Sequence, residues 1–301
     1  MNVLIIGFGS IAKKHIQALD ALNVTATIYA LRSEKDAQTH EGIINLHALS
    51  DVPDDIDFVI VSTPTSIHLQ SIKDALTLKK PLFIEKPVVR YTKEIDELLS
   101  STKEAGVPTY TACVLRHHPC LQYVKDSLSD RTIQKVQAYC GSYMPEWVPG
   151  KDFTKSFRAD AAMSGGVHLE LIHELDYCYW LFGAPKNIHS TLKKSGELGI
   201  DIIDDASYEL SYSEFTAHIN VNYLDKEAKR FLEIRFEDST WNVDLLNFRI
   251  EEDGEEIFSS EMSFADLYAS QMQYFLNCLH EGANPMNSVR EASQVLTLAL
   301  S

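Results

Sequence analysis

The chain has 301 residues, enough for about two domains, and its 45% hydrophobic content can fill their cores. It carries 43 acidic and 27 basic residues, a formal net charge of −16, and a field of this sign repels phosphate backbones and anionic membrane surfaces. We therefore expect a globular protein with no nucleic-acid partner and no membrane partner.

Cysteine use and the N-terminal residues predict a cytoplasmic location. The five cysteines form no C-x-x-C pair, and an odd number cannot all pair within one chain. Met1 leads directly into an apolar run without a basic leader or a cleavage site. No apolar run approaches the roughly 20 residues that a membrane helix needs. We expect reduced, mostly buried thiols in a soluble protein.

The first half of the chain alternates short β-branched runs with helical stretches, which is typical of a parallel sheet covered by helices. Most of these runs are apolar throughout, as strands buried on both faces are. The expected strands are 3–6, 25–31, 58–62, 81–84 and 108–114. We predict a doubly wound Rossmann domain over residues 1–115.

The first expected strand leads into a G-x-G-x-x-A sequence that begins at Gly7 and is followed by helix-compatible residues. Gly7 allows a tight turn, and Gly9 lets the backbone approach a pyrophosphate. The helix N-terminus, at Ser10 and Ile11, then faces the phosphates. These four residues predict a dinucleotide site, and the alternative is an ordinary glycine-containing turn.

The end of the second expected strand bears on the choice of cofactor. Arg32 and Ser33 stand where an NAD site places an acidic residue for the ribose hydroxyls. A cation and a hydroxyl suit a 2′-phosphate better. We expect NADP rather than NAD, and the alternative is that Arg32 is solvated while Glu34 or Asp36 binds the ribose of NAD.

The second half has a different order of elements, which predicts an α+β domain over residues 116–301 with a large, open, mostly antiparallel sheet. A strand over 133–143 precedes a polar and aromatic loop and an apolar helix over 169–182. The further expected strands lie near 191 and over 207–212, 215–223, 231–236 and 241–250. Two helices, about 263–280 and 288–299, finish the chain, and we leave open whether they pack back on the Rossmann domain.

Two further motifs follow the phosphate loop: T-P-T-S-I-H at residues 63–68 and E-K-P at residues 85–87. With these motifs in this order, the chain resembles the Gfo/Idh/MocA family, the glucose-fructose and inositol dehydrogenase-like oxidoreductases. The likeness continues through residues 115–119 and the G-G pair at 165–166, so it covers nearly the whole chain. The resemblance implies that Thr63, Pro64, His68, Glu85 and Lys86 border the cofactor.

The resemblance also implies a pair of catalytic residues, Lys86 and His173, on either side of the substrate carbon. Oxidation of a secondary alcohol needs a base for the hydroxyl proton, and the near-neutral pKa of histidine suits that task. Lys86 follows a strand at the carboxyl edge of the sheet, where it can hydrogen-bond the same oxygen. The alternative is a lysine that is merely solvated.

The segment around His173 departs from the family pattern at one position. Many members have an aspartate four residues before the histidine, where this chain has Leu169, and an acid stands one residue later at Glu170. On one helix Glu170 would share a face with His173 and could orient it or bind a sugar hydroxyl. For Asp176 we leave open a substrate contact or a structural hydrogen bond. The spacing of His168 and His173 does not suit a metal, and we expect none.

An aromatic loop before that helix is a second candidate for substrate binding. Tyr143 and Trp147 could stack on sugar faces, and Arg116 is a further substrate-binding candidate. The loop could equally be a dimer contact. We expect a homodimer or homotetramer that pairs through the open sheet, as is common in the family.

The expected function is an NAD(P)-dependent oxidoreductase acting on a sugar, cyclitol or nucleotide-sugar. One alternative is an epimerase or lyase that keeps its NAD bound. Another is a non-catalytic dinucleotide-binding regulatory protein, against which the presence of both Lys86 and His173 argues.

Overall fold

The computed structural model describes residues 1–32, 40–129 and 131–301. They form two compact units, which are described separately. Unit 1 comprises Met1–Val114 and Ser263–Gln294, and unit 2 comprises Leu115–Met262 and Val295–Ser301. The N-terminal sheet and the helix α7 (Phe264–Glu281) thus belong to one unit.

Unit 1 is built on a six-stranded parallel sheet in the order β3-β2-β1-β4-β5-β6. The strands are β1 (Asn2–Ile6), β2 (Thr27–Leu31), β3 (Ile43–Leu46), β4 (Phe58–Val61), β5 (Leu82–Glu85) and β6 (Thr109–Ala112). This is the strand order of a dinucleotide-binding fold, so the predicted doubly wound sheet is confirmed. The prediction missed β3, since this edge strand is only partly buried and lacks a continuous apolar run.

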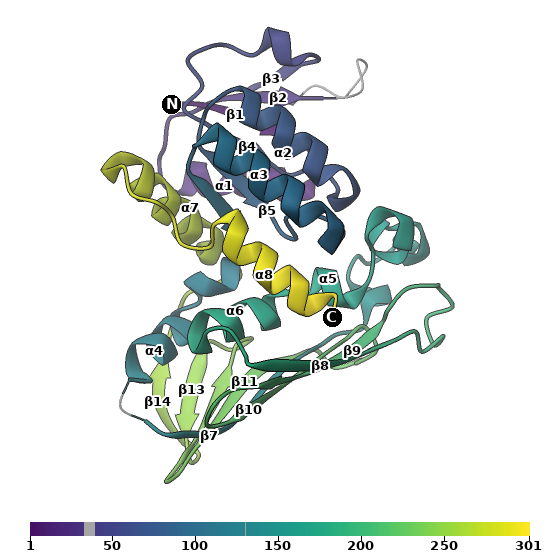
Figure 1. Ribbon diagram of the computed structural model, residues 1–301, viewed down its shortest axis with the longest axis vertical. Coiled ribbons are helices and arrows are strands. Elements are labelled where there is room, and N and C mark those ends of the chain that lie inside the picture. Colours follow the sequence, from purple (N-terminus) through teal and green to yellow (C-terminus); the bar gives the residue numbers. More distant parts are fainter. Residues whose placement is uncertain (33–39, 130) are drawn as a thin grey trace. The chain divides into compact units, whose positions relative to one another are not determined.

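Helices flank this sheet. They are α1 (Ser10–Ala21), α2 (His68–Thr77) and α3 (Ile95–Ala105), with α2 and α3 side by side in Figure 1. α1 contacts α7. The ring of Phe83 on β5 packs against Phe275 of α7 at 5.3 Å between centroids and against Tyr110 of β6 at 5.2 Å. These buried rings fix the helix layer and the sheet in one core.

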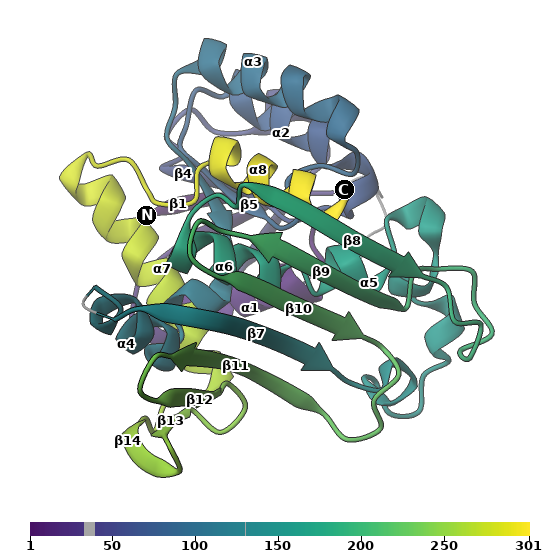
Figure 2. The same cartoon turned by 60° about the horizontal axis from the view of Figure 1, so that its bottom comes forward.

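Unit 2 contains an eight-stranded sheet in the order β14-β13-β12-β11-β7-β10-β9-β8, which Figure 2 shows from edge to edge. The strands are β7 (Ile133–Gly141), β8 (Asn187–Lys193), β9 (Asp205–Ser211), β10 (Thr216–Asn222), β11 (Lys229–Phe236), β12 (Thr240–Asp244), β13 (Arg249–Glu252) and β14 (Glu255–Ser259). β7 and β10 are parallel and the other neighbours are antiparallel. The predicted, mostly antiparallel sheet is confirmed.

Two element predictions in this unit are wrong. The expected strand over 241–250 is two strands, because the chain turns between β12 and β13, where Phe248 adopts φ +55°. The expected helix over 169–182 is also two elements, α5 (Val167–Glu170) and α6 (His173–Phe182). The apolar residues at the break, Leu171 and Ile172, are buried. The hydrophobic pattern is therefore continuous across residues at which the helix is interrupted.

Helices cover one face of this sheet. α6 packs on β7 and β10, and α5 packs on β9 and β10. The remaining helices are α4 (Pro119–Ser127), which contacts α6, and α8 (Val289–Ala299) near the end of the chain. No helix in the described ranges is both long enough and apolar enough to span a membrane.

Candidate active site

The phosphate loop lies at the carboxyl end of β1. Gly7 adopts φ +90°, and a Cβ there would stand 2.6 Å from the backbone nitrogen of Thr63. At Gly9 a Cβ would meet nothing within 4 Å. α1 begins at the next residue, Ser10, and no side chain caps its N-terminus. An open backbone and an uncapped helix N-terminus fit the pyrophosphate of a dinucleotide.

The turn after β4 supports this loop. The hydroxyl of Ser62 donates a hydrogen bond to the carbonyl of Gly7 at 2.6 Å. Thr63 follows it, and the exposed Pro64 comes next. β1 and β4 are neighbours in the sheet at the point where the strand order reverses, which is where such sheets bind ligands.

The His68 side chain faces protein groups rather than solvent. It is 1% exposed, with Nε2 at 2.6 Å from the carbonyl oxygen of Thr63 and Nδ1 at 2.8 Å from that of Pro87. Both ring nitrogens therefore contact backbone. In place of the predicted contact between His68 and a cofactor, the structure favours a role inside the protein.

The Glu85 carboxylate is likewise directed inward. Its Oε1 lies 2.7 Å from Nε2 of the fully buried His15 on α1, and its Oε2 accepts the backbone N–H of Lys86 at 3.2 Å. A direct cofactor contact by Glu85 is thus also replaced by contacts with α1 and the Lys86 turn. Lys86 itself is half-buried immediately after β5.

Arg32 follows β2, and its guanidinium lies over the Phe8 ring at 5.1 Å. Phe8 belongs to the phosphate loop, so the cation at the end of β2 lies next to that loop. The other residues predicted to read the ribose, Ser33, Glu34 and Asp36, lie outside the described residues.

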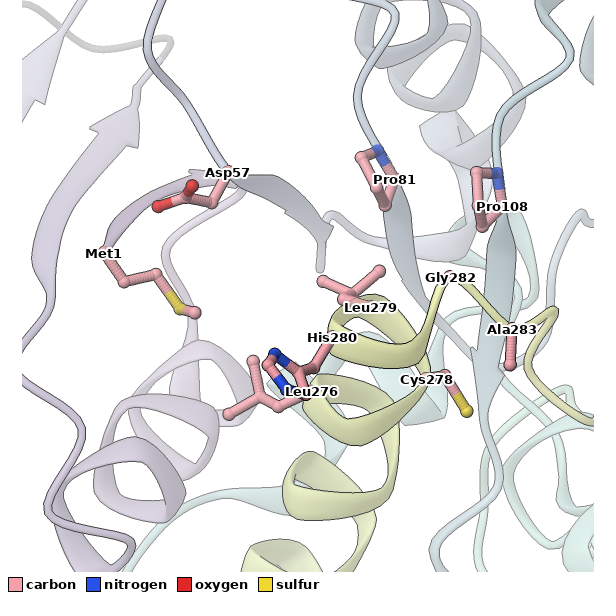
Figure 3. A pocket seen from close by; sticks show the side chains of 10 residues that line it. All are labelled: Met1, Asp57, Pro81, Pro108, Leu276, Cys278, Leu279, His280, Gly282 and Ala283. Carbon is pink, nitrogen blue, oxygen red and sulfur yellow. The ribbon is translucent and has the colours of Figure 1, made fainter.

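One cavity of unit 1 does not lie at this edge of the sheet. It has a volume of about 400 Å³ and is shown in Figure 3. Met1, Asp57, Pro81 and Pro108 line it, and each directly precedes a strand, so the cavity lies at the amino ends of the strands, against α7. It is therefore separate from the phosphate loop and Lys86.

In unit 2, His173 is the first residue of α6 and is half-buried. The next residue, Glu174, is fully buried and accepts two hydrogen bonds from Arg230 of β11, at 2.7 and 3.1 Å. The pKa of Arg230 stays above its ordinary value because Glu174 outweighs the effect of burial. This bidentate pair attaches the start of α6 to the sheet.

A second buried ion pair holds the same helix. Arg116 donates to Asp176 through Nε at 2.9 Å and Nη2 at 2.8 Å, and the side chains are 0% and 1% exposed. For Asp176 this geometry favours the structural alternative. It also replaces the predicted substrate contact of Arg116, since the guanidinium is buried against a carboxylate.

Glu170 ends α5, so the prediction that it shares one helix face with His173 is wrong. Its carboxylate pairs with Nε of Arg158 at 2.7 Å, and both side chains are partly exposed. The Arg158 guanidinium lies 5.8 Å from the centre of the Trp147 ring, and the same ring packs edge-on against Tyr223. These four side chains form one mixed polar and aromatic cluster in unit 2.

Tyr143, the other aromatic candidate, is half-buried, and the ammonium group of Lys226 lies 5.8 Å from the centre of its ring. Trp147 donates from its indole nitrogen to the hydroxyl of Ser142 at 3.0 Å. Both aromatic rings are thus anchored by neighbours within the unit, and their contact with a substrate stays a prediction.

Two family models match the chain. The oxidoreductase family with an NAD-binding Rossmann fold matches residues 1–112, and the GFO/IDH/MocA C-terminal domain matches residues 121–241. The chain belongs to the Gfo/Idh/MocA oxidoreductase family. The predicted family is confirmed, and with it a dinucleotide-binding Rossmann unit.

Named relatives act on several kinds of sugar derivative. A UDP-N-acetylglucosamine 3-dehydrogenase from Acidithiobacillus ferrooxidans is 24% identical over 257 residues, which are 82% of this chain and 75% of that protein. A 2,7-anhydro-N-acetylneuraminate hydratase from Mediterraneibacter gnavus is 30% identical over 139 residues, 46% of this chain and 37% of that protein. The chain spans about half the length of other curated relatives that it matches.

A solved structure of levoglucosan dehydrogenase with NADH and levoglucosan has the same fold. Its TM-score is 0.83 at 15% identity, and the match covers 99% of this chain and 95% of that chain. At this identity the likeness extends to the fold alone.

Three residues of the Gfo/Idh/MocA chain were not predicted although they contact candidate site residues or the direct neighbour of one. His15 lies on the buried face of α1, and a titratable residue at an apolar position was the available signal. Arg230 faces inward on β11, where alternation places apolar residues. Arg158 lies seven residues before the G-G pair, and no spacing signal indicated its partner.

Proposed function

We propose that the protein is an NAD(P)-dependent oxidoreductase that interconverts a secondary alcohol and a ketone on a sugar, cyclitol or nucleotide-sugar. The observation that carries the proposal is the position of Lys86, half-buried directly after β5 at the same carboxyl edge of the sheet as the Gly7 turn. Family membership adds that this edge belongs to an NAD-binding Rossmann fold.

In the proposed reaction Lys86 donates a hydrogen bond from Nζ to the substrate oxygen and stabilises its developing negative charge. His173 accepts the hydroxyl proton. His173 is the first residue of α6 and is half-buried. When bound, the nicotinamide supplies the acceptor for the hydride.

The proposed preference for NADP rests on Arg32, whose guanidinium would pair with a 2′-phosphate. Gly7, Gly9, Ser10 and Ile11 would hold the pyrophosphate through backbone groups. For the substrate side we propose Glu170, Tyr143 and Trp147, with Arg158 added because it pairs with Glu170.

We further propose a cytoplasmic homodimer or homotetramer that pairs through the open face of the eight-stranded sheet. All five cysteines are buried thiols, which suits a reducing compartment. Side chains on that face include Phe231, Glu233 and Gln137, on strands whose alternate residues are buried. This polar and aromatic surface suits a wet, hydrogen-bonded interface.

The test is a screen of the purified protein, loaded with NADP or NAD, against a panel of sugars, cyclitols and UDP-sugars, with formation of reduced nicotinamide as the readout. Oxidation of at least one panel member supports the proposal. An intact, cofactor-binding preparation that oxidises no member, and reduces none of the corresponding ketones, contradicts it.

A second function is favoured by one comparison. The relative from Mediterraneibacter gnavus is named a hydratase rather than a dehydrogenase, which keeps open a net non-redox reaction on a bound dinucleotide. Product analysis without added cofactor separates the two functions, because a dehydrogenase stops when its bound cofactor is reduced, whereas a hydratase or epimerase continues.

A further inference from the structure

The buried imidazole of His68 lies between two turns that have different tasks. Its Nε2 faces the Thr63 carbonyl at 2.6 Å, and its Nδ1 faces the Pro87 carbonyl at 2.8 Å. Thr63 lies in the turn after β4, and Pro87 follows Lys86 in the turn after β5. One rigid ring therefore sets the distance between these two turns.

The first of these turns is packed directly on the phosphate loop. A Cβ at Gly7 would stand 2.6 Å from the Thr63 nitrogen and 2.8 Å from the Ser62 carbonyl carbon, so the two backbones are in close contact. The Ser62 hydroxyl also donates to the Gly7 carbonyl. The position of the Thr63 turn thus follows the position of the phosphate loop.

The turn after β5, which contains Lys86, is also held by Glu85. Glu85 accepts the Lys86 N–H and contacts His15, which lies on the helix that begins at the phosphate loop. The Lys86 turn is therefore linked to the cofactor side of the unit at two places, through Glu85 and through His68.

We propose that His68 is a positioning residue, which holds the Lys86 turn at a fixed distance from the phosphate loop and so sets where Nζ of Lys86 meets the substrate. This inference rests on the proposed function of Lys86.

The chemistry of the ring suits such a contact. Both neighbours are carbonyl oxygens, which accept hydrogen bonds, and an imidazole with a proton on both nitrogens donates to both, whereas the neutral ring donates to one. The pKa of His68 is lowered, because burial outweighs the opposite effects of the two carbonyls and the Glu85 carboxylate. The neutral ring therefore donates to one carbonyl and lies in contact with the other. The ring is 1% exposed, so solvent does not compete for its two nitrogens.

His118 provides a matched control. It is also fully buried, but its Nε2 faces the Leu245 carbonyl at 3.2 Å, and its Nδ1 accepts the backbone N–H of Cys120 at 3.2 Å. A neutral ring satisfies both contacts. It lies in unit 2 and has no place in the proposed chemistry, so His118→Gln reports the general effect of removing a buried imidazole.

The experiment uses His68→Asn and His68→Gln. The Asn amide nitrogen reaches about the place of Nδ1 and keeps the donor to Pro87, whereas the Gln amide nitrogen reaches about the place of Nε2 and keeps the donor to Thr63. Either change separates the two turns. We expect kcat per folded molecule to fall about 10- to 100-fold in both variants, as for small misplacements of catalytic groups. The Kd for the dinucleotide should change by less than about threefold. The kcat of His118→Gln should stay close to that of wild type.

A double-mutant cycle with Lys86→Met tests whether His68 acts through the lysine. If it does, His68→Asn lowers the residual activity of Lys86→Met little further, because the two residues act as a unit. Full multiplication of the two effects, or kcat within about twofold of wild type in both His68 variants, overturns the proposal.

Amide hydrogen exchange gives a readout that needs no activity. We expect faster exchange in His68→Asn confined to the backbone at residues 62–67 and 85–90, and unchanged exchange there in His118→Gln. Unchanged exchange at both turns, or acceleration throughout the unit, contradicts the positioning role. If the wild type oxidises nothing in the panel while exchange responds as expected, the proposed function fails and the coupling of the two turns stands.

Discussion

Glu174 and Arg230 form a bidentate ion pair between the first turn of α6 and β11, with the Glu174 side chain fully buried and the Arg230 side chain 14% exposed. Glu174 directly follows His173, so the pair determines where the proposed base stands over the sheet. Removal of one partner would leave the other charge buried and uncompensated.

We therefore expect Glu174→Gln and Arg230→Met each to lower the free energy of unfolding by about 3–5 kcal/mol, the usual cost of breaking a buried pair. Urea unfolding measures this loss of stability. Lys73→Met is the control, because Lys73 pairs with Glu97 at side-chain exposures of 38% and 53%, and such exposed pairs contribute about 0–1 kcal/mol. Equal effects at the two sites would refute the role of the buried pair.

Alanine substitutions at Gly7 and Gly9 distinguish effects on stability from effects on cofactor binding. Gly7→Ala forces a Cβ into the Thr63 backbone at φ +90°, so we expect a loss of about 1–3 kcal/mol of stability together with weaker dinucleotide binding. Gly9→Ala meets no protein atom within 4 Å, and its φ of −99° suits alanine. We expect it to leave stability unchanged and to weaken dinucleotide binding alone. Thermal unfolding and fluorescence titration with NADPH measure the two effects, and tight NADPH binding by Gly9→Ala would contradict the site.

Arg32→Asp tests the cofactor preference. An acid at this position attracts the ribose hydroxyls of NAD and repels a 2′-phosphate, so we expect the ratio of kcat/KM for NADP to that for NAD to fall at least tenfold, or about 1.4 kcal/mol. Lys14→Asp makes the same charge change on the exposed side of α1 and should leave the ratio close to that of wild type. A ratio that does not move in Arg32→Asp removes Arg32 from the cofactor site.

Buried histidines predict a loss of stability in acid. Burial lowers the pKa of His118 and of His168 to about 4, whereas both titrate near 6.5 when the chain is unfolded. Between these values the unfolded state binds protons that the folded state does not, so stability falls as the pH drops from about 6.5 to about 4, by up to about 1.4 kcal/mol per pH unit for each ring.

The measurement is the urea midpoint at intervals from pH 7 to pH 4.5. His118→Gln and His168→Gln should each reduce the slope against pH, and His280→Gln, at an exposed position, should not. The double variant His118→Gln/His168→Gln should keep only a smaller slope, to which His117 and His68 contribute because burial lowers their pKa values too. A double variant with the full wild-type slope would contradict the prediction.

Some of this structure could be predicted because it depends on local patterns. The Rossmann unit follows from short apolar runs that alternate with helical stretches. The phosphate loop could be predicted from Gly7, because the tight turn after the first strand needs a positive φ, which favours glycine. β3 escaped prediction because Ile43–Leu46 is a partly buried edge strand. The break between α5 and α6 escaped it because Leu171 and Ile172 keep the apolar pattern of a helix while the backbone leaves it.

The partners of charged residues could not be predicted, because they come from distant parts of the chain. Arg116 and Asp176 are 60 residues apart, and His15 and Glu85 are 70 residues apart. In a sequence each of these reads as a polar residue available for ligands. Their pairing is visible only when the fold brings the two distant segments together.

The central claim is that Lys86 and His173 carry the proton transfer that accompanies oxidation of a sugar hydroxyl. The most direct measurement is single-turnover formation of reduced nicotinamide, across a range of pH, by wild type, Lys86→Met and His173→Asn, with the panel sugar that the wild type oxidises. We predict that each variant binds the dinucleotide normally and loses about 10²-fold or more in rate, and that His173→Asn also loses the acid limb of the pH profile. A rate and pH profile close to wild type in either variant would contradict the claim for that residue.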